Sequence, residues 1–217
     1  MTRRRSDFGL YLVTDRPLCC GRQIEEVVSA SVNGGVTAVQ LREKNCSTRE
    51  YIQLARNIKK ILEPFAVPLI VNDRVDVALA VGADGVHIGQ SDMPYRDVRR
   101  LMGSDAIIGV SVETREQAME AEDWEVDYLG VSPILSTPTK TDTATAWGIE
   151  GLCSLRLESS HLLVAIGGIN SSNAASVLEA GADGIAVVSA ICSAENPEEA
   201  SRRLRAIVEH VREERKR

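Results

Sequence analysis

Residues 69–92 read LIVNDRVDVALAVGADGVHIGQSD and contain one complete repeat of the chain. The apolar run at 69–71 is typical of a buried strand in a parallel sheet, and the spacing of apolar residues at 75–81 is typical of a short helix. A Gly-Ala-Asp-Gly turn at 82–85 leads to a second apolar strand at 86–88. Because the same order of strand, helix and glycine turn recurs along the chain, this stretch indicates the fold.

Polar side chains follow both strands of this stretch. Asp73 comes just after the first strand and Asp92 just after the second. Neighbouring parallel strands lie about 4.8 Å apart, so the two carboxylates can share one divalent cation, and Mg²⁺ takes one or two protein carboxylates together with substrate phosphate oxygens. The alternative is that Asp73 caps a helix and Asp92 begins a turn, but Asn72, Arg74 and Gln90 beside the pair favour a metal site.

Eight such repeats occur in the chain, at intervals of roughly 25 residues. Strands are expected at 9–14, 38–41, 69–71, 86–88, 107–110, 128–131, 163–166 and 184–188. Helices are expected at 23–32, 47–62, 75–81, 95–102, from 114, 152–157, 173–180 and from 196.

This alternation of strands and helices implies parallel pairing. Eight units predict an α/β fold, a single-domain (β/α)8 TIM barrel whose active site lies at the strand C-termini. The alternative, an open doubly wound sheet, requires a glycine-rich turn after the first strand. The recurring Gly-Ala-Asp-Gly turns at 82–85 and 181–184 instead follow helices.

The composition is that of a globular protein with one domain. The chain has 217 residues, 44% hydrophobic and 26% charged, and no apolar run approaches the roughly 18 residues that a membrane span needs. The net charge of -6 argues against a nucleic-acid binder. We expect one domain over residues 1–217, with a solvated arm at 1–8 and a charged helical tail at 210–217, and no insertion into a membrane.

The five cysteines form no CxxC pair and are odd in number, so neither a zinc site nor a disulfide framework is indicated. A cytoplasmic location, in which thiols stay reduced, fits this usage. The adjacent Cys19 and Cys20 are expected to be loop residues without a catalytic part. The sequence leaves the oligomeric state open, and a homo-oligomer is possible. It also leaves open the choice between magnesium and manganese.

In a barrel, the polar residues that follow the strands converge on one mouth. They are Gln40, Arg42, Lys44, Asn72, Asp73, Arg74, Gln90, Asp92, Ser111, Thr137, Thr139, Lys140, Gly167, Gly168 and Ser189. The cations Arg42, Lys44 and Lys140, with the two carboxylates, suit a diphosphate better than a single phosphate. The turn at 167–168 and the segment 188–190 lie where barrels commonly bind a phosphate monoester through backbone N–H groups. Two phosphorylated substrates are therefore predicted.

Plainer interpretations exist for several of these residues. Arg42 and Lys44 could be ordinary surface charges, and the glycines at 167–168 could form only a tight turn. His87 is expected to be a hydrogen-bonded barrel residue rather than a metal ligand. The loop at 132–148 is the longest in the chain, and long loops in compact domains are usually functional.

Five motifs together resemble those of the thiamine phosphate synthase family. They are VQLREK at 39–44, NDR at 72–74, GVHIGQ at 85–90 with Asp92, TPTK at 137–140 and IGGI at 166–169. Their joint order and spacing are specific, and the likeness runs from about Leu10 to Ile191. The resemblance implies a transferase that condenses 4-amino-2-methyl-5-hydroxymethylpyrimidine diphosphate with hydroxyethylthiazole phosphate. The products are thiamine phosphate and diphosphate, in thiamine biosynthesis, with Mg²⁺ as the cofactor.

The resemblance also implies roles for individual residues. The metal would be held by Asp73 and Asp92. The pyrimidine diphosphate would be bound by Gln40, Leu41, Arg42, Glu43, Lys44, Asn72, Ser111 and Lys140, of which Arg42, Lys44, Ser111 and Lys140 would act in catalysis. The thiazole phosphate would be bound by Thr137, Pro138, Thr139, Gly168, Val188 and Ser189. In the implied dissociative mechanism diphosphate leaves first and the thiazole nitrogen captures the pyrimidine methyl cation, so no protein nucleophile is needed.

One departure and two alternatives accompany this resemblance. Leu135 and Ser136 stand where the family usually has an aromatic residue and a proline or small residue, so the loop is expected to pack differently when it closes. The similar thiazole tautomerases use a histidine soon after the fifth strand, where this chain reads Ser-Val-Glu at 111–113. A non-catalytic barrel that senses thiazole phosphate would be expected to lose the metal and leaving-group residues, which are all present here.

Overall fold

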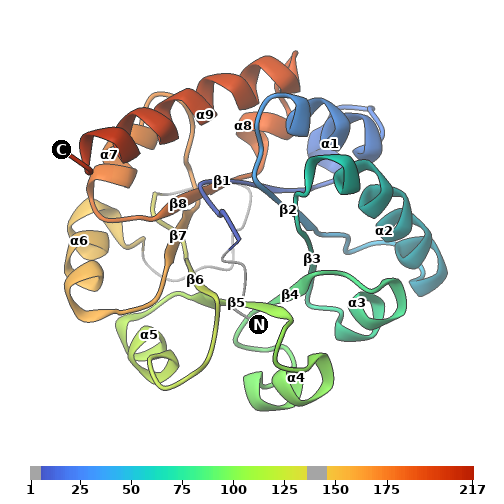
Figure 1. Cartoon of the computed structure of the whole chain (residues 1–217), viewed down its shortest axis with the longest axis horizontal. Coiled ribbons are helices and arrows are strands. Elements are labelled where there is room, and N and C mark those ends of the chain that lie inside the picture. The colour runs from blue at the N-terminus through green and yellow to red at the C-terminus, as the bar shows by residue number, and fades with distance from the viewer. Residues whose placement is uncertain (1–5, 136–145) are drawn as a thin grey trace.

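The structure is a computed structural model of the chain, and it describes residues 6–135 and 146–217. Eight parallel strands close into a barrel in sequence order, each paired with the next and β8 paired with β1. Figure 1 shows this ring of strands at the centre with the helices around its outside. The predicted TIM barrel is therefore confirmed, and the open sheet is excluded because β1 and β8 are neighbours.

The observed elements match the expected repeats closely. The strands are β1 (Leu10–Val13), β2 (Ala38–Leu41), β3 (Leu69–Asn72), β4 (Gly85–Ile88), β5 (Ile107–Val112), β6 (Tyr128–Val131), β7 (Leu163–Ile166) and β8 (Gly184–Val187). The helices are α1 (Ile24–Asn33), α2 (Thr48–Leu62), α3 (Val75–Val81), α4 (Tyr95–Met102), α5 (Arg115–Ala121), α6 (Gly148–Glu158), α7 (Ala174–Glu179), α8 (Ser189–Cys192) and α9 (Pro197–Glu214). Two short 3-10 helices are η1 (Pro17–Cys19) and η2 (Glu63–Phe65).

Two elements differ from the expected boundaries near the site. Helix α6 begins at Gly148, before the expected start at 152. The earlier start was not predicted because Trp147 at the N-cap makes no side-chain capping bond, so the sequence carries no capping signal there. Strand β5 continues past Ser111 to Val112. Ser111 therefore lies within a strand, which holds its side chain more firmly than a loop would.

Apolar side chains form two separate cores, one between strands and helices and one inside the barrel. Alternate residues of a strand point to opposite faces of the sheet, so each strand contributes to both. The interior cluster consists of Phe8, Tyr11, Val13, Ala38, Ile70, Tyr128, Val164 and Ala186. The barrel is thus filled from its N-terminal end, which leaves room for a site only at the opposite mouth.

Two glycines make room for the largest rings of this interior. Gly109 pairs with His87 on one side and with Tyr128 on the other. A Cβ atom at Gly109 would lie 2.0 Å from Cζ of Tyr128, and one at Gly130 would lie 2.9 Å from Cε1 of His87. The two rings lie 5.5 Å apart between centroids, in space that Gly109 leaves open for Tyr128 and Gly130 for His87.

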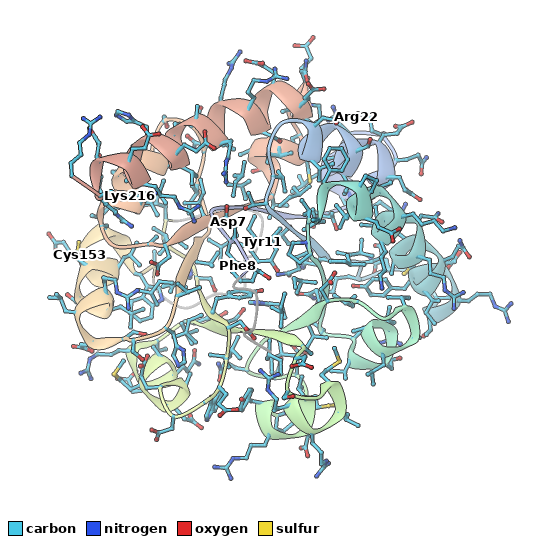
Figure 2. The ribbon with its side chains drawn as sticks, viewed as in Figure 1. Asp7, Phe8, Tyr11, Arg22, Cys153 and Lys216 are labelled. Carbon is cyan, nitrogen blue, oxygen red and sulfur yellow. The ribbon has the colours of Figure 1, made fainter. Side chains whose placement is uncertain are left out.

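Parts of both described ends of the chain contact the barrel, while residues 213–217 of the charged tail are exposed. Asp7 accepts a hydrogen bond from Nη1 of Arg212 at 2.8 Å, and the ring of Phe8 lies 4.5 Å from that of Tyr128. Figure 2 shows Asp7 and Phe8 close together near the middle of the ring of strands. Arg215 donates to backbone carbonyls around the turn between α7 and β8. The run of charges in the sequence did not reveal these acceptors.

No helix in the described part of the chain is long and apolar enough to cross a membrane. The cysteines Cys19, Cys20, Cys46, Cys153 and Cys192 are free thiols. Cys19 and Cys192 are buried, whereas Cys20 is exposed on the surface.

We predict that Gly109→Ala destabilises the protein by at least about 1–3 kcal/mol, because the new methyl group must displace the buried ring of Tyr128. The measurement is the free energy of unfolding in urea. Gly151→Ala is the matched control, since its Cβ would meet Trp147 at an ordinary 3.4 Å and helix α6 favours alanine. Equal stabilities of the two variants would contradict the fitted interior.

We also predict a pH-dependent contribution of Asp7 to stability. Burial alone would raise the pKa of Asp7, but the Gly9 N–H and the guanidinium groups of Arg212 and Arg205 lower this pKa below its ordinary value. A lowered folded-state pKa gives stability that is present above the unfolded pKa of about 3.9 and is lost as the pH falls through the folded pKa.

Because the Asp7 side chain is 40% exposed, the contribution is expected to be only about 0.5 kcal/mol. Urea unfolding of wild type and Asp7→Asn should differ by this amount near pH 7 and converge below about pH 3. A difference that stays constant across this range would show that the carboxylate charge of Asp7 is not the cause.

Candidate active site

A cavity of about 430 Å³ opens at the C-terminal end of the strands, within the roughly 300–1,000 Å³ usual for small-molecule sites. Gln90 and Gly167 of the predicted mouth line it, together with ten residues to which the resemblance gives roles. These ten are Gln40, Arg42, Lys44, Asn72, Asp73, Asp92, Ser111, Gly168, Val188 and Ser189. The strands from which they come are spread around the barrel, so the closed sheet is what brings them together.

Some predicted residues do not present their side chains to this cavity. Leu41 is fully buried in the core between strands and helices, and Glu43 accepts a hydrogen bond from Nε of Arg16 at 2.6 Å. Arg74 also turns away, donating from Nε to Asp76 at 2.8 Å. Because neighbouring residues of a strand face opposite sides, the run after β2 presents only alternate side chains to the site.

The predicted residues of the long loop lie outside the described residues. These are Ser136, Thr137, Pro138, Thr139 and Lys140. Leu135, the last described residue before them, packs against the core between strands and helices.

Asp73 and Asp92 meet at the mouth, as their places after adjacent strands predicted. Asp73 has a left-handed backbone, with φ of 60°, which turns the chain sharply after β3. Its Oδ2 accepts from Nζ of Lys44 at 2.7 Å, and Oδ2 of Asp92 accepts from the N–H of Gly89 at 2.7 Å. The two carboxyl groups are also in direct contact with each other.

The pKa values of this pair move in opposite directions. Burial raises the pKa of Asp92 and the charge of Asp73 raises it further, against the opposing bond from Gly89. Burial would raise the pKa of Asp73 as well, but the bonds from Lys44 and Asp92 outweigh it and lower that pKa. The site thus holds two carboxyl groups side by side, with the ammonium group of Lys44 as the cation that compensates Asp73.

This donor set fits a magnesium ion. Two adjacent carboxylates are hard oxygen ligands, and a divalent cation between them would relieve their repulsion. In residues 6–135 and 146–217, no third histidine, cysteine, aspartate or glutamate joins them as a metal-binding group. The remaining positions would therefore fall to water and ligand oxygens, the coordination that magnesium prefers.

Arg42 is held in place by a carboxylate that the sequence analysis did not single out. Nη1 of Arg42 donates to Oδ2 of Asp15 at 2.9 Å, and the backbone N–H of Arg42 donates to Oγ1 of Thr14 at 3.0 Å. Asp15 lines the cavity. It comes two residues after the end of β1, so the signal that identified Asp73, a polar residue close after a strand, could also have found Asp15.

The floor of the cavity is a chain of hydrogen bonds across the barrel. Nε2 of Gln40 donates to Oη of Tyr11 at 3.2 Å, and Oη of Tyr11 lies 2.8 Å from Oη of Tyr128. Tyr128 in turn lies 2.9 Å from Nδ1 of His87, and Nε2 of His87 lies 2.8 Å from Oγ of Ser111. His87 is therefore the hydrogen-bonded barrel residue that was expected. Both tyrosines were missed, because a tyrosine inside an apolar strand carries no separate signal.

A second group of residues lies across the mouth, after β7 and β8. Gly167 and Gly168 both have positive φ, 107° and 71°, and a Cβ at Gly167 would come within 3.0 Å of Pro133. Val188 and Ser189 line the cavity from the next strand. In the strand order, β7 and β8 lie opposite β3 and β4, so the mouth has two polar regions that face each other.

A TIM barrel with carboxylates, cations and a glycine turn at its strand ends belongs to the class of phosphate-binding barrel enzymes. Comparison with known proteins gives the family. The sequence model of the family described as thiamine monophosphate synthase matches residues 10–191. The chain therefore belongs to the thiamine monophosphate synthase family, and thiamine-phosphate synthases are transferases.

Individual relatives agree with this assignment. A thiamine-phosphate synthase of Leptospira biflexa is 55% identical over 201 residues, which cover 91% of this chain and 96% of the relative. A thiamine-phosphate synthase of Albidiferax ferrireducens is 54% identical over 93% of this chain and 92% of the relative. The solved structure of a thiamine phosphate pyrophosphorylase from Pyrococcus furiosus superposes with a TM-score of 0.88 at 42% identity, over 95% of this chain and 98% of that chain.

We predict that Arg42→Met weakens the binding of inorganic diphosphate by about 10- to 100-fold, the effect of losing one charge-assisted hydrogen bond. Arg74→Met is the matched control, because Arg74 also follows a strand but pairs with Asp76 outside the cavity. Isothermal titration calorimetry in the presence of Mg²⁺ measures both. Equal losses in the two variants would mean that general surface charge, rather than the cavity, attracts the anion.

Proposed function

We propose that this chain condenses 4-amino-2-methyl-5-hydroxymethylpyrimidine diphosphate with hydroxyethylthiazole phosphate to give thiamine phosphate and diphosphate. The observation that carries the proposal is the convergence of ten predicted residues on one cavity in a chain of this family. Reduced, free thiols are consistent with a cytoplasmic location for this enzyme.

The pyrimidine diphosphate fits the side of the cavity formed by β2 to β5. Arg42 and Lys44 are cations at the mouth, and each is paired with a carboxylate in the structure, Asp15 and Asp73 respectively. A diphosphate would replace these carboxylates as the partner of the cations. Gln40 and Ser111, which lie deeper, would then contact the pyrimidine end of the molecule.

The thiazole phosphate fits the opposite side, after β7 and β8. Gly168, Val188 and Ser189 line the cavity there, and the two consecutive glycines with positive φ leave backbone N–H groups uncovered by side chains. The resemblance adds residues 137–139 of the loop to this side. Two phosphorylated ligands held across one mouth would present the thiazole nitrogen to the pyrimidine methylene carbon.

The reaction needs a good leaving group more than a protein nucleophile. The bond between the methylene carbon and the diphosphate oxygen breaks first, and its electron pair leaves with diphosphate. The thiazole nitrogen then donates its lone pair to the methylene carbon. Arg42 and Lys44, with Lys140 as implied by the resemblance, would stabilise the charge that grows on the departing diphosphate. The cavity would hold both rings in line, which replaces an encounter in solution.

Asp73 and Asp92 would hold Mg²⁺ beside the leaving group. When bound, the metal supplies positive charge to the diphosphate oxygens and neutralises the like charges of the two carboxylates. Lys44, released from Asp73 by that neutralisation, would be free to turn toward the diphosphate.

Incubation of the protein with both substrates and Mg²⁺ tests the proposal, with thiamine phosphate followed by fluorescence after oxidation. Product is expected only when both substrates are present, and a chelator should abolish it. Absence of product, with the same substrates turned over by a working synthase, would refute the proposed reaction.

We predict that Asp92→Asn lowers kcat by at least about 100-fold at saturating substrates, because the loss of one carboxylate charge weakens the metal site. Asp97→Asn is the control, since Asp97 lies on the nearby helix α4 and pairs with Arg100 on the surface. Wild-type turnover by Asp92→Asn in the presence of Mg²⁺ would remove the metal assignment of Asp92.

A further inference from the structure

The hydrogen-bond chain at the floor joins two predicted substrate contacts that lie on different strands. Gln40 on β2 is at one end and Ser111 on β5 is at the other, and the links between them are Tyr11, Tyr128 and His87. The five side chains come from five different strands, so none of the links follows from a neighbour in sequence.

The hydrogen atoms of this chain run in one direction. The amide nitrogen of Gln40 can only donate, so the hydroxyl of Tyr11 accepts from it, and the hydroxyl of Tyr128 is then the one acceptor among these five side chains for the hydrogen of Tyr11. The hydroxyl of Tyr128 then donates to Nδ1 of His87. A neutral histidine that accepts at Nδ1 carries its hydrogen on Nε2, which donates to Oγ of Ser111.

This direction makes one end of the hydrogen-bond chain a donor toward a ligand and the other end an acceptor. Oγ of Ser111 accepts from His87, so its own hydrogen is available to a ligand and the hydroxyl acts as a donor. At the other end, the nitrogen of the Gln40 amide is used by Tyr11, and the amide oxygen remains as an acceptor. Both residues line the cavity. The floor therefore offers one acceptor and one donor, held apart by a rigid chain.

The packing around the chain keeps it rigid. Tyr11 and Tyr128 are fully buried, and Phe8 closes the space below them with ring centroids 5.7 Å and 4.5 Å away. Gly109 leaves the space that the ring of Tyr128 fills. Burial raises the pKa of both tyrosines far above their ordinary value, so both hydroxyls keep the protons that the chain requires.

We propose that Tyr128, with Tyr11, is a positioning residue that makes Ser111 a hydrogen-bond donor and Gln40 an acceptor toward the pyrimidine ring. This inference rests on the proposed function. An aminopyrimidine carries both complementary groups, an exocyclic amino group that donates and ring nitrogens that accept. A pyrimidine without the amino group lacks the donor that the Gln40 amide oxygen requires.

Tyr128→Phe tests the inference, because it keeps the ring and removes the hydroxyl that links Tyr11 to His87. The dissociation constant of the pyrimidine diphosphate, measured by calorimetry, is expected to rise about tenfold, which corresponds to about 1.4 kcal/mol. In steady-state assays the KM for the pyrimidine diphosphate should rise with it. The KM for the thiazole phosphate should stay unchanged, since none of the links reaches Gly168 or Ser189.

Two control variants separate positioning from loss of packing. Tyr95→Phe removes a tyrosine hydroxyl from α4, where the ring stacks on Trp124 outside the barrel. Phe8→Leu loosens the floor under Tyr128 without touching any hydroxyl of the chain. Tyr95→Phe should bind the pyrimidine diphosphate as the wild type does, and Phe8→Leu should lose clearly less affinity than Tyr128→Phe. An equal loss of affinity in Phe8→Leu would attribute the effect of Tyr128→Phe to packing and overturn the inference.

A double-mutant cycle with Ser111→Ala makes the test specific. If Tyr128 acts through the chain, Tyr128→Phe should weaken binding about tenfold in the wild type and by less than about twofold in the Ser111→Ala background. Equal effects in both backgrounds would overturn the inference.

Calorimetry also separates the inference from the proposed function. Binding with the expected cycle but without turnover would refute the reaction and leave the positioning role standing. Turnover by wild type with unchanged affinity in Tyr128→Phe would refute the positioning role alone. A wild type that does not bind the pyrimidine diphosphate would refute both.

Discussion

The space inside the barrel is the constraint on which the site depends. An eight-strand barrel is only wide enough for its interior side chains, and here Tyr128 fills space that Gly109 leaves open beside it. That fit places the hydroxyl of Tyr128 between Tyr11 and His87, and so connects β1 and β4 through β6. The filled interior becomes the polar floor of the cavity, and the predicted site residues stand above it at the strand ends.

The charges above this floor balance each other in pairs. Lys44 pairs with Asp73 and Arg42 pairs with Asp15. Each cation of the cavity thus has a carboxylate partner, in a protein whose net charge is -6. In the proposed reaction these partners are exchanged. Diphosphate takes the place of the carboxylates beside the cations, and Mg²⁺ takes the place of Lys44 beside Asp73. Under the proposed function, the site would therefore bind diphosphate only together with a metal that compensates the carboxylates left behind.

Much of this arrangement could be predicted from the sequence, because periodic patterns determine it. The repeats gave the barrel, and the rule that strand ends converge placed Asp73, Asp92 and Ser111 together. The direction in which each side chain points could not be predicted in the same way. Leu41 faces the helices, and Arg74 bonds to Asp76, although both lie in motifs that the site uses.

The floor itself could not be predicted, for a physical reason. Tyr11 and Tyr128 occur in apolar strands where their rings serve packing, and their hydroxyl groups acquire a role only when the barrel closes and β1 meets β6 across the interior. Likewise, Gly109 appears in the sequence as an ordinary strand residue. Its importance lies in the 2.0 Å that would separate its Cβ from Tyr128, a distance that exists only in the folded chain.

The most direct test of the directional floor is the protonation of His87, measured by ¹⁵N NMR of histidine-labelled protein. The chain has three histidines, and His161→Gln and His210→Gln would leave the His87 signals to be assigned. The hydrogen-bond chain predicts a neutral ring with its hydrogen on Nε2, toward Ser111. A hydrogen on Nδ1 would reverse the direction of the chain, make Ser111 an acceptor and contradict the role assigned to Tyr128.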